Sequence, residues 1–471
     1  MIKTPLQLLL IVVLSISTFV CDGQLRLPGL FSSHMVLQQQ STQSVWGWAS
    51  PLEKISVKVS WDTVTSRIVT PNTGLWKTTI KTPAAGGPFT ITVSNGHETV
   101  TLTDVMSGEV WLASGQSNME WSMNASSDGK PLVDQINDPN IRLFHVPKSA
   151  ADAPQVKGEG MWTSCGKETV GSFSAVAYFF GKKLNSELNI PIGLISASWG
   201  GTPAETWVPR EVIESDEELK KAAKVQTDDK PWCPSNPGVT YNAMIHPLIG
   251  FQIAGAIWYQ GETNVSAPYS YKHLMETLIT DWRKEFDKEF PFFYVQIAPF
   301  SGYGDVEKGT LIREQQVKML EIAKTGMVVI SDHVDKVDDI HPKFKQPVGE
   351  RLANLALTDT YGKKGISSQS PIYSEMKVEK GRIKLSFDFA EGGLVSKGGA
   401  PNEFVIAGPD KLFYPAVAKI NGSSVIVSAK EVKQPVAVRF AWRNKSIGNL
   451  FSKEGLPVSS FRTDDWAIEV R

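Results

Sequence analysis

Four short segments of the chain carry residue types that together can perform nucleophilic acyl transfer. The first is Ser114-Gly-Gln-Ser-Asn-Met, in which Ser117 occupies a tight turn. The others are Trp199-Gly-Gly-Thr-Pro-Ala-Glu-Thr-Trp, Tyr259-Gln-Gly-Glu-Thr-Asn and Asp338-Asp-Ile-His-Pro. They supply a hydroxyl, a glycine pair, side-chain amides and an Asp/His pair, which are the parts that this chemistry needs.

Ser117 and His341 are the predicted nucleophile and general base. A serine hydroxyl is a poor nucleophile until a base removes its proton, and histidine can do so near neutral pH. The second ring nitrogen of that histidine needs an acceptor, which fixes the tautomer and stabilises the imidazolium formed during attack. Asp338, three residues before His341, is the predicted acceptor, and a one-residue shift of this role to Asp339 stays open.

An oxyanion develops on the tetrahedral intermediate of acyl transfer, and preorganised donors must stabilise it. The predicted donors are the backbone N–H groups of Ser117 and Gly201 and one side-chain amide, with Gln260 preferred and Asn264 second. Glycine suits position 201 because the absent side chain lets the backbone approach a substrate closely.

Other titratable residues near these segments have competing interpretations. His333 is the main rival to His341, and Asp332 is the corresponding rival to Asp338. Glu205 and Glu262 follow glycine-rich turns. They are predicted to be buried and to hold the loops in place through hydrogen bonds. A paired-carboxylate glycosidase mechanism is therefore the weaker fit.

Buried strands are predicted directly before the first three segments, and a further predicted strand precedes the loop that carries the fourth. The continuous apolar runs typical of strands buried on both faces are Glu109–Ala113, Ile192–Ser198, Ile253–Trp258, Phe292–Ala298 and Met327–Ser331. Helical apolar stripes run from Phe173 to Leu188 and from Tyr271 to Phe286. This alternation predicts an α/β unit with a mostly parallel sheet between helices. Because ligands bind beyond the carboxyl ends of such strands, the four segments are expected to meet at one edge.

The chain is long enough for more than this one unit. It has 471 residues, with 48 Lys and Arg against 49 Asp and Glu. Strand-length alternating patterns predict an N-terminal β-domain over residues 24–103 and a C-terminal β-domain over residues 363–471, flanking the catalytic unit at 104–362. The balanced charge, with no basic run, argues against a nucleic-acid partner.

Residues 1–23 are predicted to be a signal peptide. Lys3 precedes an apolar run from Leu8 to Val20 that is too short to span a membrane, and no later stretch reaches spanning length. The expected location is secreted or periplasmic, with lipid attachment at Cys21 as the alternative. In an oxidising compartment Cys165 and Cys233 either pair or remain two unrelated buried thiols.

Taken together, the four segments resemble the successive blocks of the SGNH hydrolases. Within that superfamily the chain most resembles the sialate O-acetylesterase branch of carbohydrate esterases, over roughly Asp104 to Leu357. The resemblance implies a flavodoxin-like α/β/α sandwich, no metal or other cofactor, and an O-acetylated sugar as the partner. It also implies Ser117 as nucleophile, His341 as base, Asp338 as orienting acid and Gly201 as an oxyanion donor. The third block differs from the Gly-x-Asn-Asp sequence that is typical of the superfamily, which leaves the choice between Gln260 and Asn264 open.

The resulting prediction is an exported serine esterase that deacetylates carbohydrate through an acetyl-serine intermediate, with sialate as the first choice of sugar. One alternative is an acetylesterase of plant polysaccharide such as xylan or xyloglucan, which would use identical chemistry. Another is a carbohydrate-binding protein with a retired hydrolase domain. The intact Ser117, Gly201, Asp338 and His341 argue against retirement.

Overall fold

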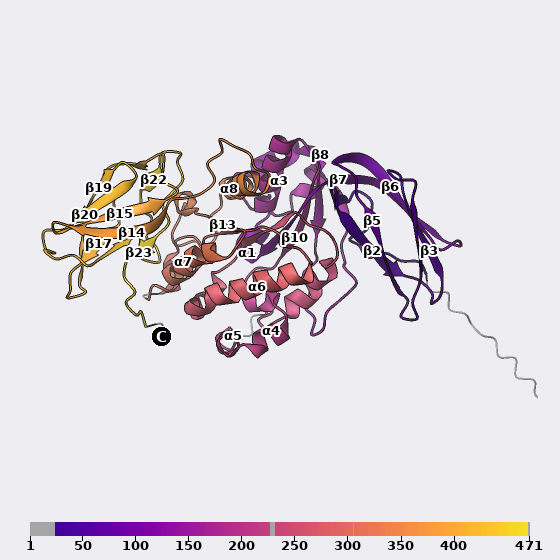
Figure 1. The fold of residues 1–471 in the computed structure, drawn as a ribbon, viewed down its shortest axis with the longest axis horizontal. Coiled ribbons are helices and arrows are strands. Elements are labelled where there is room, and N and C mark those ends of the chain that lie inside the picture. The colour runs from indigo at the N-terminus through magenta and orange to yellow at the C-terminus, as the bar shows by residue number, and fades with distance from the viewer. Residues whose placement is uncertain (1–23, 227–230, 305, 470–471) are drawn as a thin grey trace, which may run out of the picture.

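The structure, a computed structural model, describes residues 24–226, 231–304 and 306–469. The predicted signal peptide, residues 1–23, lies outside the described residues. Three units follow one another along the longest axis of the molecule: an N-terminal β-domain, a central α/β unit and a C-terminal β-domain (Figure 1).

The central unit is built on a mostly parallel sheet with the order β13-β12-β11-β7-β10-β8-β9. Its strands are β7 (Thr99–Gly115), β8 (Asn137–His145), β9 (Trp162–Gly166), β10 (Ile192–Ser198), β11 (Gly255–Tyr259), β12 (Phe292–Val295) and β13 (Thr325–Val328). All neighbouring pairs are parallel except β8 with β9. Every residue of β10, β11 and β12 is buried, as the continuous apolar runs predicted.

Helices cover both faces of this sheet. One apolar cluster joins α3 (Ala175–Leu188) and α8 (Gln346–Leu355) to Ile257 of β11, whereas another joins α6 (Tyr271–Glu285) and α7 (Lys308–Lys318) to Trp258. Because consecutive side chains of a strand point to opposite faces, the two helix pairs lie on opposite sides. The predicted α/β/α sandwich is thereby confirmed. The shorter helices are α1 (Ser117–Glu120), α2 (Lys167–Val170), α4 (Arg210–Ser215) and α5 (Glu217–Ala223).

The N-terminal β-domain and the central unit share a strand. The domain contains β1 (Val36–Gln38), β2 (Thr42–Trp48), β3 (Lys54–Val59), β4 (Thr65–Val69), β5 (Leu75–Lys81) and β6 (Gly86–Ser94). Strand β7 pairs with β6 between Thr99 and Ser107, and then continues between β10 and β11. The predicted boundary between residues 103 and 104 thus falls inside a continuous strand. Because one apolar cluster also contains residues of both units, β7 is held by both of them, and the Ser117 turn follows directly at its end.

The C-terminal β-domain is antiparallel and has its own core. Its strands are β14 (Ile372–Glu379), β15 (Arg382–Asp388), β16 (Leu394–Ser396), β17 (Phe404–Ala407), β18 (Phe413–Pro415), β19 (Val417–Asn421), β20 (Ser424–Ser428), β21 (Ala437–Phe440), β22 (Leu450–Ser452) and β23 (Phe461–Arg462). Two four-stranded sheets, β14-β15-β20-β19 and β18-β17-β21-β23, enclose apolar residues such as Leu385, Val425 and Phe440.

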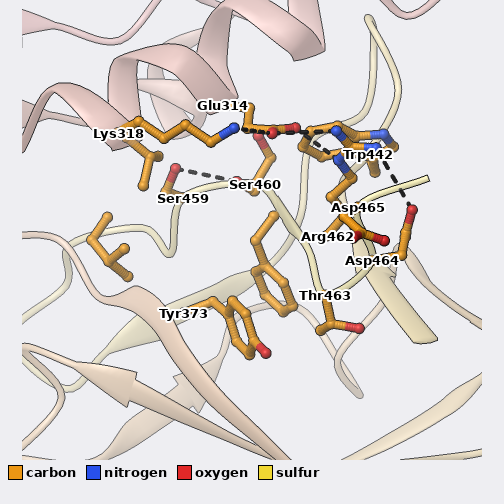
Figure 2. A pocket seen from close by; sticks show the side chains of 13 residues that line it. Glu314, Lys318, Tyr373, Trp442, Ser459, Ser460, Arg462, Thr463, Asp464 and Asp465 are labelled. Carbon is orange, nitrogen blue, oxygen red and sulfur yellow. Dashed lines mark hydrogen bonds and ion pairs between the residues drawn. The ribbon is translucent and has the colours of Figure 1, made fainter. Parts of the chain in front are cut away.

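Helix α7 forms the junction with the C-terminal domain. The Arg462 guanidinium lies 2.8 Å from the Glu314 carboxylate of α7. Beside this ion pair is a cleft of about 700 Å³, lined by side chains from both units that include Lys318, Tyr373 and Trp442 (Figure 2). The cleft marks the domain boundary and does not include the residues of the four segments.

The sequence predicts no membrane-spanning segment and leaves open whether Cys165 and Cys233 form a disulfide. No helix in the described part of the chain combines the length and the apolar composition that crossing a membrane requires. Cys165 and Cys233 are both buried and are not bonded to each other. Burial raises the pKa of the Cys165 thiol to about 12.

Candidate active site

The four segments meet at the carboxyl edge of the central sheet. Strands β7, β10 and β11 are neighbours and run parallel, so the loops that follow Gly115, Ser198 and Tyr259 leave the sheet on the same side. The fourth segment lies between β13 and α8 and closes over the turn that begins α1. The sheet therefore assembles residues separated by more than 200 positions in the chain.

Ser117 and His341 are hydrogen-bonded to each other. The Nε2 atom of His341 lies 2.8 Å from the Oγ atom of Ser117. The indole of Trp121 stacks on the imidazole, with ring centres 4.6 Å apart and an interplanar angle of 22°. The stacked indole fixes the plane of the ring, and a hydrogen bond of this kind is the geometry that a serine hydroxyl and a general base require.

The imidazole of His341 is half-buried, and burial lowers its pKa below the ordinary histidine value. The nearby Lys345 cation lowers this pKa further, while the Asp339 carboxylate opposes the shift. The ring is therefore neutral at neutral pH, which is the state that a general base needs.

Asp339, and not Asp338, lies beside the second ring nitrogen. Its Oδ1 atom is 3.8 Å from Nδ1 of His341 and accepts the backbone N–H of the same residue at 2.9 Å. That backbone hydrogen bond is the largest cause of the lowered pKa of Asp339. Asp338 is exposed, and no contact joins its carboxylate to His341 among the described residues. The separation of 3.8 Å exceeds a hydrogen bond, so the loop must close slightly for Asp339 to accept from the ring.

The rival pair, Asp332 and His333, is engaged elsewhere. Both carboxylate oxygens of Asp332 accept from the guanidinium of Arg351 on α8, at 2.8 and 2.7 Å. The Nε2 atom of His333 lies 3.2 Å from the same guanidinium. This cluster ties the loop after β13 to α8 and makes no contact with Ser117 among the described residues.

The glycine pair packs against the turn that carries Ser117. A Cβ atom added to Gly200 would lie 3.2 Å from Cβ of Ser117, and the Gly200 N–H donates to the Glu120 carboxylate at 2.6 Å. Gly201 has φ +84°, a conformation that favours glycine. Within the described residues, the N–H groups of Ser117 and Gly201 have no acceptor. These two donors remain available for an oxyanion, whereas the Gly200 N–H is already used.

The amides of Gln260 and Asn264 form a buried network. Gln260 Nε2 donates to Asn264 Oδ1 at 2.7 Å and to the Thr202 carbonyl at 3.4 Å. Asn264 Oδ1 also accepts the Ala204 N–H at 3.0 Å, and its Nδ2 donates to the Glu205 carboxylate at 2.9 Å. Burial raises the pKa of Glu205. In this conformation the two amides brace the loop that carries Gly201, and no contact joins either amide to Ser117 among the described residues.

Sequence reasoning did not single out three residues near Ser117 and Gly201: Asn118, Lys345 and Trp232. The Nζ atom of Lys345 donates to Asn118 Oδ1 at 2.7 Å, and both side chains are fully buried. The indole of Trp232 is 65% exposed beside Gly201, and a Cβ at that glycine would lie 3.0 Å from its Nε1. Among the described residues, no group of three or more His, Cys, Asp or Glu side chains is arranged to hold a metal ion.

Comparisons with known proteins agree with this geometry. A family model described as "Carbohydrate esterase, sialic acid-specific acetylesterase" matches residues 107–358. The sialate O-acetylesterase of Rattus norvegicus is 29% identical, with the match covering 82% of this chain and 83% of the relative. That of Mus musculus is 30% identical, covering 77% and 79%.

A solved structure shares both sequence and fold. The crystal structure of a carbohydrate acetylesterase from Xanthomonas citri is 37% identical, with a TM-score of 0.86, and the match covers 94% of this chain and 100% of that one. The resemblance stated for the four segments is thus confirmed. A family model over more than half of the chain, together with a relative at 30% identity, shows that the chain belongs to the carbohydrate esterase family of sialic acid-specific acetylesterases and is an ester hydrolase.

Proposed function

We propose that this chain removes acetyl groups from sugar hydroxyls through an acetyl-serine intermediate at Ser117. The observation that carries the proposal is the hydrogen bond of 2.8 Å between Ser117 Oγ and His341 Nε2, at the carboxyl edge of a parallel sheet. The relatives named sialate O-acetylesterase support the acetyl ester of a sugar as the substrate.

The geometry suits a two-step acyl transfer. Nε2 of His341 takes the proton of Ser117 as Oγ attacks the acetyl carbonyl carbon, and the N–H groups of Ser117 and Gly201 bind the resulting oxyanion. The intermediate collapses as the bond to the sugar oxygen breaks, and the imidazolium gives its proton to that oxygen. A water molecule then attacks the acetyl-serine while His341 accepts its proton. The bond between the acetyl carbon and Ser117 Oγ breaks, the imidazolium returns the proton to Oγ, and acetate leaves.

Asp339 is the orienting acid of this proposal. Its carboxylate faces Nδ1 of His341 and is held there by the backbone N–H of the same residue. A small closure of the loop places Oδ1 in hydrogen-bond range of the ring, which stabilises the imidazolium during both steps. Gln260 and Asn264 act through the loop that they hold, since their donors are used within it.

The preferred sugar is sialate, and the second candidate is an acetylated plant polysaccharide. The test is release of acetate from O-acetylated sialosides, acetylated xylo-oligosaccharides and p-nitrophenyl acetate by the purified full chain. A kcat/KM that is highest for the sialosides supports the first assignment, and preference for the xylo-oligosaccharides supports the second. Failure to release acetate from every ester would instead favour a retired, carbohydrate-binding domain.

We also propose that the protein acts outside the cytoplasm after removal of residues 1–23. The support is the sequence pattern of a charged residue followed by an apolar run of signal-peptide size. Edman sequencing of the protein recovered from its native host should begin at residue 24. A mature chain that begins at Met1 would contradict the proposal.

The activity should depend on pH through His341. Because burial and Lys345 hold the pKa of His341 below its ordinary value of about 6.5, the acidic limb of kcat/KM is expected below that pH, with a plateau through neutrality. Initial rates on p-nitrophenyl acetate in buffers of constant ionic strength measure the limb. A midpoint above 7 would show that the imidazole does not have the environment described here.

Trp232 should contribute to binding of the sugar and not to the chemistry. Its exposed indole lies beside Gly201, and its carbonyl accepts from Nε1 of Trp199 at 2.9 Å. Since an aromatic face packs on a sugar ring, Trp232→Ala should raise KM for the sugar ester about three- to tenfold. The kcat/KM for p-nitrophenyl acetate, which has no sugar, should stay within twofold. Trp61→Ala, in the N-terminal β-domain, is the control, and equal losses on both esters would refute the assignment.

A further inference from the structure

A fully buried lysine lies beneath the nucleophile turn, and the acyl-transfer steps do not use it. Lys345 precedes α8 and follows His341 by four residues, and none of its side chain reaches solvent. Its Nζ donates to Asn118 Oδ1 at 2.7 Å and lies 5.8 Å from the ring centre of Trp121 and 5.4 Å from that of Tyr259. A buried cation is costly unless its surroundings compensate, so its presence beside the active site requires a reason.

Asn118, the residue after the nucleophile, connects this lysine to two other loops. Its Nδ2 donates to the Glu262 carboxylate at 2.6 Å and to the carbonyl of Ile340 at 3.1 Å. Glu262 belongs to the loop after β11, and Ile340 immediately precedes the catalytic histidine. A single amide therefore joins the nucleophile turn, the third loop, the histidine loop and the start of α8.

The backbone of the same region is held independently. The N–H groups of Lys345 and Gln346 donate to the Asp128 carboxylate, at 3.2 and 2.7 Å. The start of α8 would consequently stay in place when the Lys345 side chain is changed. What the side chain adds is its contact with Asn118 and its position behind Trp121, the indole that stacks on His341.

We propose that Lys345, acting through Asn118, is a positioning residue that holds the Ser117 turn and the His341 loop in the mutual arrangement that proton transfer needs. This inference rests on the proposed acyl-transfer function and deepens it. Proton transfer is sensitive to displacements of about 1 Å, and the 2.8 Å bond between Ser117 and His341 depends on both loops at once.

The charges around Lys345 and His341 predict how the pH dependence of the rate changes when Lys345 is replaced. Lys345 is influenced by Glu262, Asp128, Asp339 and Asp335, and burial lowers its pKa to about 7. His341 is influenced by Lys345 and Asp339. In the acidic limb of the rate profile Lys345 is protonated, so its cation helps to keep the imidazole deprotonated. Removal of the cation should move that limb to higher pH.

The experiment uses the full chain with three variants, measured on an ester that the wild type hydrolyses. Lys345→Met should lower kcat about 10- to 100-fold with little change in KM, and should shift the acidic limb of kcat/KM upward. Asn118→Ala should give a similar loss of kcat. The double variant should lose no more than the more damaging single variant, because both changes break one connection.

Lys288→Met is the matched control. Lys288 is partly buried, has a pKa lowered by burial, and donates to the carbonyl of Ile253 at the opposite end of β11. It should keep the wild-type kcat and pH profile. Circular dichroism and thermal unfolding identify misfolded variants, and Lys345→Gln replaces Lys345→Met if the latter does not fold.

Three results would overturn the inference: a kcat for Lys345→Met equal to that of Lys288→Met, an unmoved acidic limb, or losses that multiply in the double variant. Each of them can occur in a chain whose wild type releases acetate normally. By contrast, a wild type that hydrolyses no ester would overturn the proposed function itself. The two failures are therefore distinguishable.

Discussion

Replacing Ser117 by alanine is expected to lower kcat for acetyl-ester hydrolysis by about 10³-fold or more. The hydroxyl is the attacking atom in the proposed mechanism. The backbone N–H groups of positions 117 and 201 survive the change, so oxyanion binding remains and KM should change little. Initial rates of acetate release from p-nitrophenyl acetate and from an acetylated sugar measure the loss.

The same variant tests the covalent intermediate. Wild-type enzyme quenched in acid during turnover should carry an acetyl group on the peptide that contains Ser117, and the variant should not. Ser114→Ala is a matched control, because Ser114 is a buried serine of the same segment whose Oγ has no hydrogen-bond partner. Its removal should be nearly neutral. Retention of more than a tenth of the wild-type kcat by Ser117→Ala would contradict a serine nucleophile.

The elements that carry the site were predictable because burial leaves a strong periodic signal. Strand β10 was predicted with its observed bounds, and the stripe from Tyr271 to Phe286 marks α6 to within one residue. These segments are buried along their whole length or along one complete face. That the loops carrying Ser117 and His341 meet then followed from topology, since parallel strands deliver their carboxyl ends to one edge.

Elements with mixed environments were harder to predict. Strand β8 begins with Asn137-Asp-Pro-Asn, whose residues are mostly exposed, and only residues 141–144 are buried. Strand β7 spans two domains, and its burial changes from alternating to continuous along its length. A pattern that changes within one strand looks like a boundary in the sequence, which is why a domain limit was predicted inside β7.

Loop side chains escaped prediction for a different reason. Local hydrogen bonds set the direction in which an amide or a carboxylate points. They leave no periodic pattern in the sequence, unlike the burial of a helix or a strand. Gln260 and Asn264 turn toward each other and toward Glu205, which the spacing of the third segment does not reveal. Lys345 lies in Pro342-Lys-Phe-Lys, a stretch that looks solvated, yet its side chain is fully buried.

Asp339→Asn is expected to lower kcat/KM by up to about 10⁴-fold, while Asp338→Asn should stay within about threefold of the wild type. Asn preserves the shape of the side chain but removes the charge that stabilises the imidazolium and fixes its tautomer. Only the carboxylate of Asp339 faces Nδ1 of His341, at 3.8 Å, whereas Asp338 is exposed. The two variants differ by one position in one loop, so each is the other's control.

The pH profile separates an electrostatic role from a structural one. The Asp339 carboxylate raises the pKa of His341 against the larger effect of burial, so its removal should move the acidic limb of kcat/KM to still lower pH. A merely structural role would lower the rate and leave the limb in place. The opposite pattern is a large loss in Asp338→Asn alone. It would mean that the loop rearranges on substrate binding and that Asp338, not Asp339, orients His341. Rate profiles of both variants on p-nitrophenyl acetate decide between these outcomes, because the ester is the same and only the carboxylate differs.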